Sequence, residues 1–452
     1  MSFPRYPAYK ESGIDWLGVI PEHWSVMPLA RIASGPGSLF IDGDWVESKD
    51  LADEGIRYIT TGNVGEGKYK EQGSGYISQE KFDELRCTEV LPGDVLISRL
   101  NLPIGRACVV PDLGERIITS VDNVITRPDD GYSRTYLAYM LSSAAHFANM
   151  EILARGTTMQ RISRSALGQV RFAFPSPDEQ KAIALFLDRE TAKIDALVAE
   201  QEQLITLLKE KRQAVISHAV TKGLDPSVPM KDSGVEWLGE VPEHWQMLPL
   251  KRVSPAQTVG IVVNPSTYVC EDGLPFIYGG DIADGVVHYE GARRISVELS
   301  DSQPKTRLSA GDLVTVRVGA PGVTAVVPPE CEGGNCASVM LIRRGNFNSE
   351  WLCFLMNSRV VRYQVEVVQY GAAQEQFNIA HATEFVLPVP PFDEQRVIAE
   401  ELMAEAGRLE ELEHEAEAVI RLLQERRSAL ISAAVTGQID VRGLAPAQAQ
   451  AA

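Results

Sequence analysis

The sequence has few cysteines, no long apolar run and a shortage of positive charge. Its six cysteines include no C-x-x-C pair, and no histidine or second cysteine pair lies beside Cys331 and Cys336 to complete a zinc ligand set. We therefore expect reduced, buried thiols and no metal site. No stretch approaches about 18 uninterrupted apolar residues, and the first residues lack the charged-then-apolar pattern of a signal peptide. We expect a cytoplasmic protein.

Acidic residues outnumber basic ones, 61 to 43, which gives a formal net charge of −18 at pH 7. This charge argues against a protein whose whole surface binds nucleic acid, because the phosphates would be repelled. Any affinity for nucleic acid is then confined to local loops or shared with a partner.

What the sequence does contain is a long repeat. The phrase SGIDWLGVIPEHW at Ser12–Trp24 returns as SGVEWLGEVPEHW at Ser233–Trp245, 221 positions later. Four further segments match at offsets of 218 and then 215 positions: PGDVLISR (Pro92–Arg99) with AGDLVTVR (Ala310–Arg317), YLAYMLSS (Tyr136–Ser143) with WLCFLMNS (Trp351–Ser358), DEQKAIA (Asp178–Ala184) with DEQRVIA (Asp393–Ala399), and EKRQAVISHAVT (Glu210–Thr221) with ERRSALISAAVT (Glu425–Thr436). A solenoid repeats every roughly 20–50 residues. We interpret this much longer period as a tandem duplication of a whole domain.

Each copy begins with a globular part, roughly residues 1–175 and 226–390. Gly, Pro and Asp break these parts into short apolar runs such as DVLIS and DLVTV, which predicts an α+β fold. Gly93-Asp94 and Gly311-Asp312 are expected to form tight turns that enter a buried strand.

Each copy ends with a helical part, Asp178–Val220 and Asp393–Val435, in which Gly407 is the only Gly or Pro. The Asp that opens each segment is expected as the N-cap, and the Gly that follows each segment as the C-terminal stop. Both helices carry the same heptad-like stripe, which favours two helices packed on each other over a helix packed on its own globule. The stripe consists of Leu187, Ile194, Leu197, Leu204, Leu208 and Val215 in the first helix, and Leu402, Leu409, Leu412, Val419, Leu423 and Leu430 in the second.

The order globule–helix–globule–helix predicts two similar α/β domains separated by two long antiparallel helices, a coiled-coil spacer with pseudo-two-fold symmetry. At about 1.5 Å per residue, each helix is a rod of about 65 Å. The expected boundaries are 1–176 for the first domain, 177–222 for the central helix, 223–391 for the second domain, 392–437 for the distal helix and 438–452 for a flexible tail.

No catalytic motif has all the residues that its chemistry needs. Gly62–Lys68 fits the Walker A spacing, but Tyr69 stands where a Ser or Thr would hold Mg²⁺, so a hairpin turn is favoured. The Asn-Pro-Pro-aromatic tetrad of amino-methyltransferases is missing, because Val389–Phe392 lacks the Asn.

Two further groups of polar residues have structural interpretations. Asp178 and Glu179 are weak candidates for nuclease carboxylates, and capping of a helix start explains them better. His23 and His244 belong to the repeated phrase, yet no Ser or Cys nucleophile repeats with them. We interpret both histidines as part of a structural turn around the repeated Trp.

Two loops of the first copy carry side chains that contact nucleic acids. Glu151–Pro175 holds four Arg against one Glu, and its RGTTMQR stretch offers Arg, Gln and hydroxyls to phosphates and base edges. Ser98–Arg106 is the second loop. The second copy keeps Arg317, while its segment Gly371–Asn378 is not basic. A solvated surface loop is an equal alternative for each of these segments. The two copies match in their core segments and differ in their polar loops, which favours a protein with two recognition domains that bind two different targets.

Four segments, taken together, resemble the specificity subunit of type I restriction–modification systems: YKESGIDWLGVIPEHW, DEQKAIALFLDRETAKIDAL, EKRQAVISHAVTKGLD and TGQIDVRG. The resemblance covers nearly the whole chain. It implies that each globule is a target recognition domain for one half of a split, asymmetric DNA sequence, and that the helix pair sets the gap between the halves. It also implies two modification subunits that bring S-adenosylmethionine, and a restriction subunit that uses ATP and Mg²⁺. The specificity subunit itself carries no cofactor and no chemistry.

From their positions in the loops, twelve residues are expected to contact DNA: Arg99, Asn101, Arg106, Arg155, Thr157, Thr158, Gln160 and Arg161 in the first domain, and Arg317, Gln374, Gln376 and Asn378 in the second. The Glu-rich face of the second helix is expected to point away from DNA or toward a modification subunit. Two other classes stay open. One is a two-headed protein-binding scaffold without base-specific DNA recognition, and the other is a nuclease, for which the sequence offers no carboxylate cluster.

Overall fold

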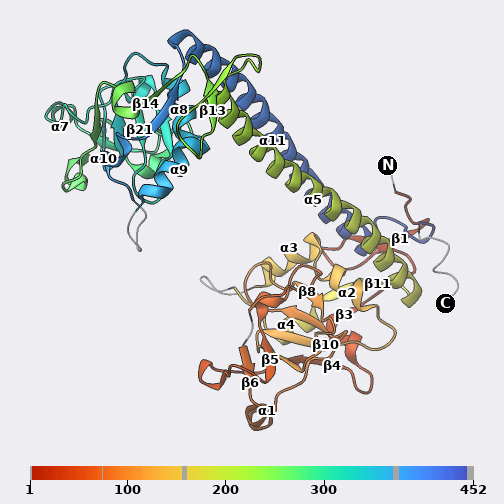
Figure 1. Ribbon diagram of the computed structural model, residues 1–452. Coiled ribbons are helices and arrows are strands. Elements are labelled where there is room, and N and C mark those ends of the chain that lie inside the picture. The colour runs from red at the N-terminus through yellow and green to blue at the C-terminus, as the bar shows by residue number, and fades with distance from the viewer. Residues whose placement is uncertain (1–2, 74, 155–159, 370–375, 445–452) are drawn as a thin grey trace. The chain divides into compact units, whose positions relative to one another are not determined.

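The computed structural model describes residues 3–73, 75–154, 160–369 and 376–444. The chain divides into two compact units (Figure 1), one made of Met1–Gln201 with Ala418–Ala452 and the other of Glu202–Glu417. The fold is mixed α/β with two long helices, α5 (Pro177–Lys222, 46 residues) and α11 (Phe392–Val435, 44 residues). Each long helix contributes one segment to each unit.

The first unit contains short strands and helices before α5. They are β1 (Tyr9–Glu11), β2 (Val19–Pro21), β3 (Ser25–Pro28), η1 (Leu29–Ala33), β4 (Leu39–Asp42), η2 (Ser48–Asp50), β5 (Ile56–Ile59), η3 (Thr61–Asn63), β6 (Gly75–Ile77), α1 (Gln79–Leu85), β7 (Val95–Ser98), β8 (Ala107–Val109), β9 (Ile117–Thr119), β10 (Asn123–Arg127), α2 (Arg134–Met140), α3 (Ala144–Leu153), α4 (Arg164–Gln169) and β11 (Arg171–Phe174). The antiparallel sheet β4-β10-β7-β8 lies at the centre. In the sheet β6-β5-β9, β5 pairs with β9 in parallel.

The second unit repeats the strand order of the central sheet, and it adds a fourth strand to the other sheet and the separate pair β18-β19. Its elements are β12 (Met230–Asp232), β13 (Glu240–Pro242), β14 (Gln246–Pro249), α6 (Leu250–Val253), β15 (Gln257–Val259), η4 (Pro265–Tyr268), β16 (Val269–Cys270), β17 (Leu274–Ile277), η5 (Gly279–Asp281), β18 (Ile282–Ala283), β19 (Val286–Val287), β20 (Arg293–Ile295), α7 (Val297–Asp301), β21 (Leu313–Thr315), β22 (Thr324–Val326), η6 (Pro329–Cys331), β23 (Asn335–Cys336), β24 (Met340–Ile342), α8 (Ser349–Asn357), α9 (Arg359–Val368), α10 (Ile379–Ala382) and β25 (Val386–Val389). The sheet β15-β24-β21-β22 corresponds to the central sheet of the first unit, and β17 pairs in parallel with β23.

An ion pair with a buried Asp closes the turn before β7 and the turn before β21. The Asp94 carboxylate, 2% exposed, accepts the Leu91 backbone N–H at 2.8 Å and binds the Arg127 guanidinium at 2.7 Å. Asp312, also 2% exposed, binds Arg343 at 2.7 Å. The glycines before these two Asp have φ of 88° and 85°, a conformation that Gly adopts without strain. The two predicted Gly-Asp turns are confirmed.

The long helices begin at Pro177 and Phe392, each one residue before the Asp that is expected as the N-cap. The Asp after each of them therefore lies in the first turn and is not the N-cap. Proline suits the first helical position because its missing N–H has no partner there, and the Ser176 hydroxyl accepts a first-turn backbone N–H of α5 at 3.3 Å. The expected stops are confirmed, since Gly223 and Gly437 have φ of 75° and 77°.

The apolar stripe of the long helices is buried toward the helix ends and exposed in the middle. The buried residues are Leu187, Ile194, Leu208, Leu402, Leu409 and Leu430, and Val215 and Leu423 are half-buried. At the ends the helices share the cores of the units: Leu187 and Leu430 belong to the first core and Leu402 to the second. The exposed residues, 40–47% accessible, are Leu197, Leu204, Leu412 and Val419.

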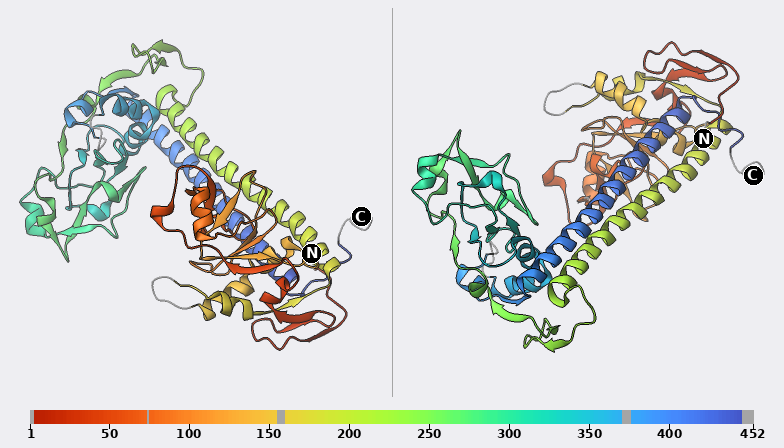
Figure 2. Two further views of the ribbon diagram at one scale, coloured as in Figure 1. Left: turned by 90° about the horizontal axis from the view of Figure 1, so that it is seen from below. Right: turned by 90° about the horizontal axis from the view of Figure 1, so that it is seen from above.

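Ion pairs join the two helices inside each unit. In the first unit the Arg427 guanidinium of α11 binds the Asp195 carboxylate of α5 at 3.0 Å, and the two helix segments lie side by side in both views of Figure 2. In the second unit the Lys211 ammonium of α5 and the Glu405 carboxylate of α11 are 3.5 Å apart. Pairs this exposed contribute about 0–1 kcal/mol, so apolar packing stabilises the contact more.

The repeated phrase fastens each globular part to the start of the helix that follows it. In the first unit the buried Glu179 carboxylate binds His23 Nε2 at 2.8 Å and accepts the Trp24 indole N–H at 3.3 Å and the Tyr6 hydroxyl at 2.7 Å. Burial and the Glu179 carboxylate raise the pKa of Tyr6, so its hydroxyl stays protonated and donates. In the second unit Glu394 binds His244 at 2.8 Å and Trp245 at 3.1 Å. The histidines thus serve a structural turn, as predicted, and Glu179 does more than cap a helix.

The segment after α11 is packed further than the sequence predicts. A flexible tail is expected from residue 438, but Ile439 and Val441 are buried in the core of the first unit. The Asp440 backbone N–H donates to the Pro4 carbonyl at 2.8 Å, and the Arg442 guanidinium lies 4.9 Å from the centre of the Tyr6 ring. The physical reason is that the apolar residues in QIDVRG find an apolar surface beside the first strands. Residues 445–452 lie outside the described residues.

Glu179→Ala is expected to destabilise the first unit by about 3 kcal/mol, because it leaves a buried indole N–H and a buried hydroxyl without an acceptor. Glu394→Ala is expected to cost only about 1 kcal/mol, because the Glu394 side chain is 30% exposed and water can replace it. Urea unfolding curves measure both. Asp178→Ala, on an exposed neighbour in the same turn, is the control and should change stability by less than about 0.5 kcal/mol. Equal losses for all three variants would contradict this account.

Candidate nucleic-acid interface

The structure brings together the two loops of the first unit that the sequence singles out. Leu100, just after β7, forms an antiparallel β-bridge with Arg161, just before α4. The Asn101 backbone N–H donates to the Gln160 carbonyl at 3.3 Å. Asn101 and Arg161 are exposed, and Gln160 is half-buried. Two loops about 60 positions apart in the sequence thus form one surface.

The second unit forms the same contact with other side chains. Val318, just after β21, forms an antiparallel β-bridge with Gln376, just before α10. The Arg317 Nε–H donates to the Phe377 carbonyl at 3.3 Å. Asn378 is the N-cap of α10, and its side-chain oxygen accepts the Ala380 N–H at 3.0 Å.

Arg99 lies inside the first unit, where it holds the two loops together. Its side chain is 7% exposed, its Nη1 donates to the Ile162 carbonyl at 3.2 Å, its Nη2 donates to the Val121 carbonyl, and the Asp42 carboxylate lies 3.2 Å away. Burial lowers the pKa of Arg99, but the nearby Asp42 opposes that shift. The Arg99–Ile162 bond has a counterpart in the Arg317–Phe377 bond of the second unit. The two arginines are 218 positions apart and the two acceptor residues are 215 positions apart, which are the offsets of the repeat.

Arg106 is also buried and fixes the loop that precedes it. Its Nη1 donates to the carbonyls of Asn101 at 2.9 Å and Pro103 at 3.2 Å, while Nε donates to Val64 at 2.7 Å and Nη2 to Thr61 at 2.8 Å. Every side-chain nitrogen therefore has a backbone acceptor. Arg106 holds the loop in place and is not itself part of the exposed surface.

Two exposed arginines beside this surface pair with carboxylates that sequence reasoning missed. Arg161 Nη2 lies 2.8 Å from Asp122 Oδ1, and Arg164 Nε lies 3.5 Å from Asp42 Oδ2. Asp42 ends one strand and Asp122 lies in the turn between β9 and β10. Both come from segments without a local signal, so only the tertiary fold brings them to the arginines.

Comparison with known proteins agrees with this geometry. Residues 21–207 match the family described as type I restriction modification DNA specificity domain. Over these residues the chain is similar to the type I restriction–modification specificity family. The resemblance found in the sequence is confirmed.

Relatives in this specificity family match most of the chain. A Methanocaldococcus jannaschii protein, provisionally named type I restriction enzyme MjaX specificity subunit, is 23% identical and covers 96% of this chain and 98% of its own length. The type I restriction enzyme EcoBI specificity subunit of Escherichia coli is 24% identical over 88% of this chain and 83% of its own length.

Two solved structures have a similar fold. One comes from work on complex assembly and conformational transition of the type I R-M system, with a TM-score of 0.64, 16% identity, and coverage of 92% of this chain and 98% of that one. The other is the HsdS subunit from Thermoanaerobacter tengcongensis, with a TM-score of 0.53, 17% identity, and coverage of 95% and 100%. At these identities the likeness concerns the fold alone.

Four of the expected DNA contacts lie outside the described residues: Arg155, Thr157, Thr158 and Gln374. Arg161, Asn101, Gln160, Gln376 and Asn378 lie at the bridged loops. The remaining three arginines, Arg99, Arg106 and Arg317, bind backbone carbonyls of the loops.

Other types of site find no support in the part of the chain that the structure describes. No group of three or more His, Cys, Asp or Glu there could hold a metal ion, and no helix there is long and apolar enough to cross a membrane. The Walker-like segment is the predicted hairpin, with a Val64–Tyr69 bridge and a bond from the Gly65 N–H to the Lys68 carbonyl at 3.0 Å. The Lys68 ammonium binds Asp195 of α5 at 2.5 Å.

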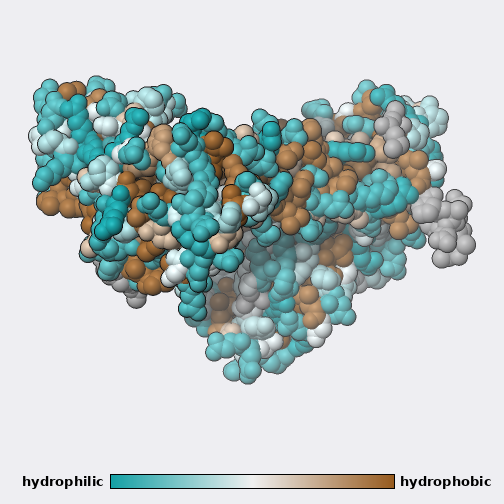
Figure 3. Space-filling model, turned by 45° about the horizontal axis from the view of Figure 1, so that its top comes forward, coloured by the Kyte–Doolittle hydropathy of each residue, from teal (hydrophilic) through white to brown (hydrophobic). Residues whose placement is uncertain are grey.

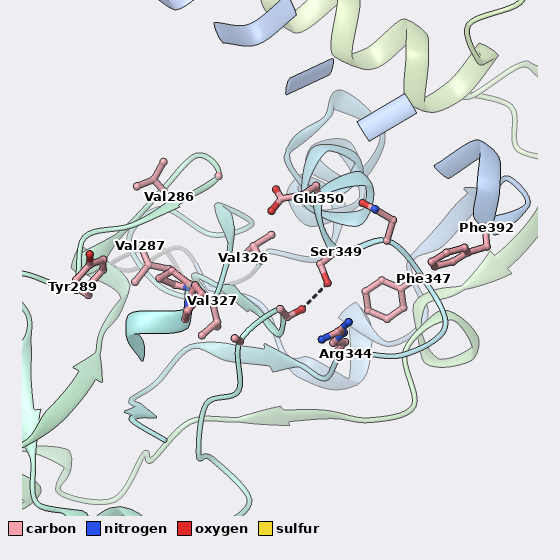
Figure 4. Close-up of a pocket in the computed structure, with 16 residues that line it drawn as sticks. Val286, Val287, Tyr289, Val326, Val327, Arg344, Phe347, Ser349, Glu350 and Phe392 are labelled. Carbon is pink, nitrogen blue, oxygen red and sulfur yellow. Dashed lines mark hydrogen bonds between the residues drawn. The ribbon is translucent and has the colours of Figure 1, made fainter. Parts of the chain in front are cut away.

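An open pocket of about 700 Å³ lies in the second unit (Figure 4). Val286, Val326 and Phe347 line its apolar walls, and Arg344 and Glu350 add one charge of each sign. Burial raises the pKa of Glu350. Of the predicted DNA contacts that the structure describes, none lines this pocket.

The exposed surface mixes apolar and hydrophilic side chains, as the face drawn in Figure 3 shows. Leu102, at the tip of the first loop, is 59% exposed, and Ile152, in the last turn of α3, is 80% exposed. Singly exposed apolar side chains are common on protein surfaces. We assign no role to either residue.

The buried His146 of α3 supports the first loop from beneath. Its Nε2 lies 3.2 Å from the Gly105 carbonyl, while its Nδ1 has no partner among the described residues. A Cβ on Gly105 would lie 2.5 Å from His146 Nε2, so a larger residue does not fit there. Burial lowers the pKa of His146 from 6.5 to about 4.

Lowering the pH from 7 to 5 is expected to destabilise the wild-type chain by about 2 kcal/mol more than His146→Gln. The histidine's folded pKa lies below its unfolded pKa, so its full stabilising contribution is present above pH 6.5 and is lost as the pH falls toward about 4. Gln keeps an N–H donor for Gly105 but does not titrate. Urea unfolding of both proteins at several pH values measures the difference. Parallel pH profiles would show that His146 does not cause the loss.

Proposed function

We propose that this chain is a non-catalytic specificity subunit that recognises a bipartite, asymmetric DNA sequence and directs its methylation and restriction by partner subunits. The observation that carries the proposal is one loop arrangement that occurs in both units with different side chains. In each unit a residue two or three positions after a central strand is bridged to a residue three positions before a short helix. Equivalent scaffolds that present different polar groups suit the reading of two different half-sites.

The proposal extends to the domain layout. Residues 1–176 and 223–391 would be two target recognition domains that arose by tandem duplication. Residues 177–222 and 392–437 would be spacer helices that pair as an antiparallel coiled coil and fix the gap between half-sites. The shared strand order of the two units and the matched Glu179 and Glu394 anchors support this layout.

The arginines divide into two roles within this proposal. Arg99 and Arg106 are positioning residues, because both are buried, both donate from their guanidinium groups to backbone carbonyls, and Arg99 also pairs with the half-buried Asp42 carboxylate. Arg317 holds the Phe377 carbonyl through Nε, and no carboxylate pairs with it among the described residues. Its remaining donors can therefore bind DNA as well as position the loop. Asn101, Gln160, Arg161, Gln376 and Asn378 would contact bases or phosphates, together with Arg155, Thr157, Thr158 and Gln374.

The exposed middle of each long helix is a candidate docking surface for partner subunits. Leu197, Leu204, Leu412 and Val419 are each at least 40% exposed on helices whose ends are buried, and covering such side chains stabilises a complex. Two modification subunits would bring S-adenosylmethionine, and restriction subunits, where present, would bring ATP and Mg²⁺. The cytoplasm, where host DNA is accessible, is the expected compartment.

Deleting the gene for this chain is expected to remove adenine methylation from one bipartite motif in host DNA, because the partner subunits lose their only sequence reader. Single-molecule sequencing of modified bases measures this. Re-expression of the wild-type chain should restore the motif, and the matched control is a chain with Asp178→Ala on the exposed first turn of α5, which should restore it equally. If methylation persists unchanged although the modification subunits are expressed, the chain is a protein-binding scaffold and the proposal is wrong.

A further inference from the structure

One pair of equivalent residues carries different hydrogen-bonding groups in the two units, and such groups can distinguish one base from another. Arg161 and Gln376 are 215 positions apart, which is the offset of the flanking matched segments. Each makes one β-bridge to the residue after the central strand, Leu100 in the first unit and Val318 in the second. The backbone therefore presents both side chains from the same place on the two scaffolds.

The residue that faces Arg161 also has an equivalent in the second unit. The registers of β10 on β7 and of β24 on β21 align Thr126 with Ile342. Counting four residues back passes the start of both strands and makes Asp122 equivalent to Ser338. The turn there is one residue shorter in the second unit, and the Ser338 N–H donates to the Ile261 carbonyl as the Val121 N–H donates to the Asp44 carbonyl in the first. The first unit thus combines an arginine with a carboxylate, and the second combines an amide with a hydroxyl residue.

The carboxylate holds Arg161 without burying it. Asp122 Oδ1 binds only Nη2, at 2.8 Å, and 52% of the Arg161 side chain is exposed against 23% for Asp122. Nε and Nη1 keep their donors free of partners among the described residues. A fixed guanidinium loses less side-chain entropy on binding, and a nearby negative charge weakens its attraction to phosphates at random positions. Gln376 is neutral and needs no such carboxylate.

We propose that this position reads one base in each half-site: Arg161, held by Asp122, reads a guanine, and Gln376 reads an adenine. Arginine donates two hydrogen bonds to O6 and N7 of guanine, while the amide of glutamine pairs with N6 and N7 of adenine in the major groove. Asp122 is then a positioning residue that raises the preference for the specific site over random DNA. The inference rests on the proposed function and adds the identity of one base in each half-site.

The first test exchanges the side chains in the full complex with modification subunits. Arg161→Gln is expected to change the preference at a single position of the first half-site from guanine to adenine, with at least about a tenfold change in the ratio of the two. Gln376→Arg together with Ser338→Asp is expected to change adenine to guanine at one position of the other half-site. Ser338 has φ of 61°, a conformation that Asp tolerates well. Methylation maps and selection of bound sequences from a random DNA library give independent readouts.

Arg164→Gln is the matched control, because it removes an equally exposed arginine from the same segment. It is expected to weaken binding to all sequences alike and to leave the motif unchanged. If Arg161→Gln also weakens all sequences alike, Arg161 contacts only phosphate and the inference is wrong. If the wild-type complex itself selects no motif from the library, the proposed function fails instead, so the two failures are distinguishable.

Asp122→Asn tests the positioning role separately. It is expected to tighten binding to random DNA several-fold, to steepen the dependence of log affinity on log salt concentration by about one, and to reduce the preference for the specific site. Thermal unfolding checks that the variant folds, and Ser338→Ala in the second unit is the neutral control. An unchanged ratio of specific to random binding in a folded Asp122→Asn protein would overturn the role of this carboxylate.

Discussion

A glutamate in the first turn of each long helix is the contact on which both units depend. Glu179 is buried and joins a tyrosine, a histidine and a tryptophan from the first 24 residues to α5. Glu394 makes the matching contact with the second histidine and tryptophan. A buried carboxylate is costly without such partners, so the repeated phrase and the DEQ segment depend on each other. This dependence explains why both are the best-matched parts of the two copies, although neither lies at the loops.

The two units share one backbone scaffold at the central strand but place different side chains on it. Both keep an arginine at the end of the central strand that holds a carbonyl of the opposite loop. In the first unit Asp42 neutralises this arginine in the interior. In the second unit the place equivalent to Asp42 is Val259, so Arg317 keeps its charge uncompensated among the described residues. The scaffold therefore permits a change of the polar groups at its surface without a change of strand order.

Sequence patterns predicted the fold well where the determinants are local. Glycines after the helices, Gly-Asp turns and short buried strands depend on neighbouring residues, and the repeat offsets identified equivalent elements. The patterns failed where distant residues decide. Arg99 and Arg106 read as loop cations, but the fold buries both beneath the loop. Asp42, Asp122 and His146 have no local signal, and only the tertiary contacts give them roles. The apolar tail residues Ile439 and Val441 were likewise assigned to a flexible end, because their binding surface comes from the opposite end of the chain.

The distribution of charge limits what this chain can do alone. The net charge is −18, two loop arginines are buried, and two exposed ones pair with aspartates. Exposed glutamates of α11, such as Glu410, Glu411 and Glu415, form no ion pair within the part of the chain that the structure describes. Most affinity for DNA comes from uncompensated cations near phosphates, and the described residues of the bridged loops offer few. Under the proposed function, the loops would discriminate between bases more than bind tightly, and partner subunits would supply the larger part of the affinity.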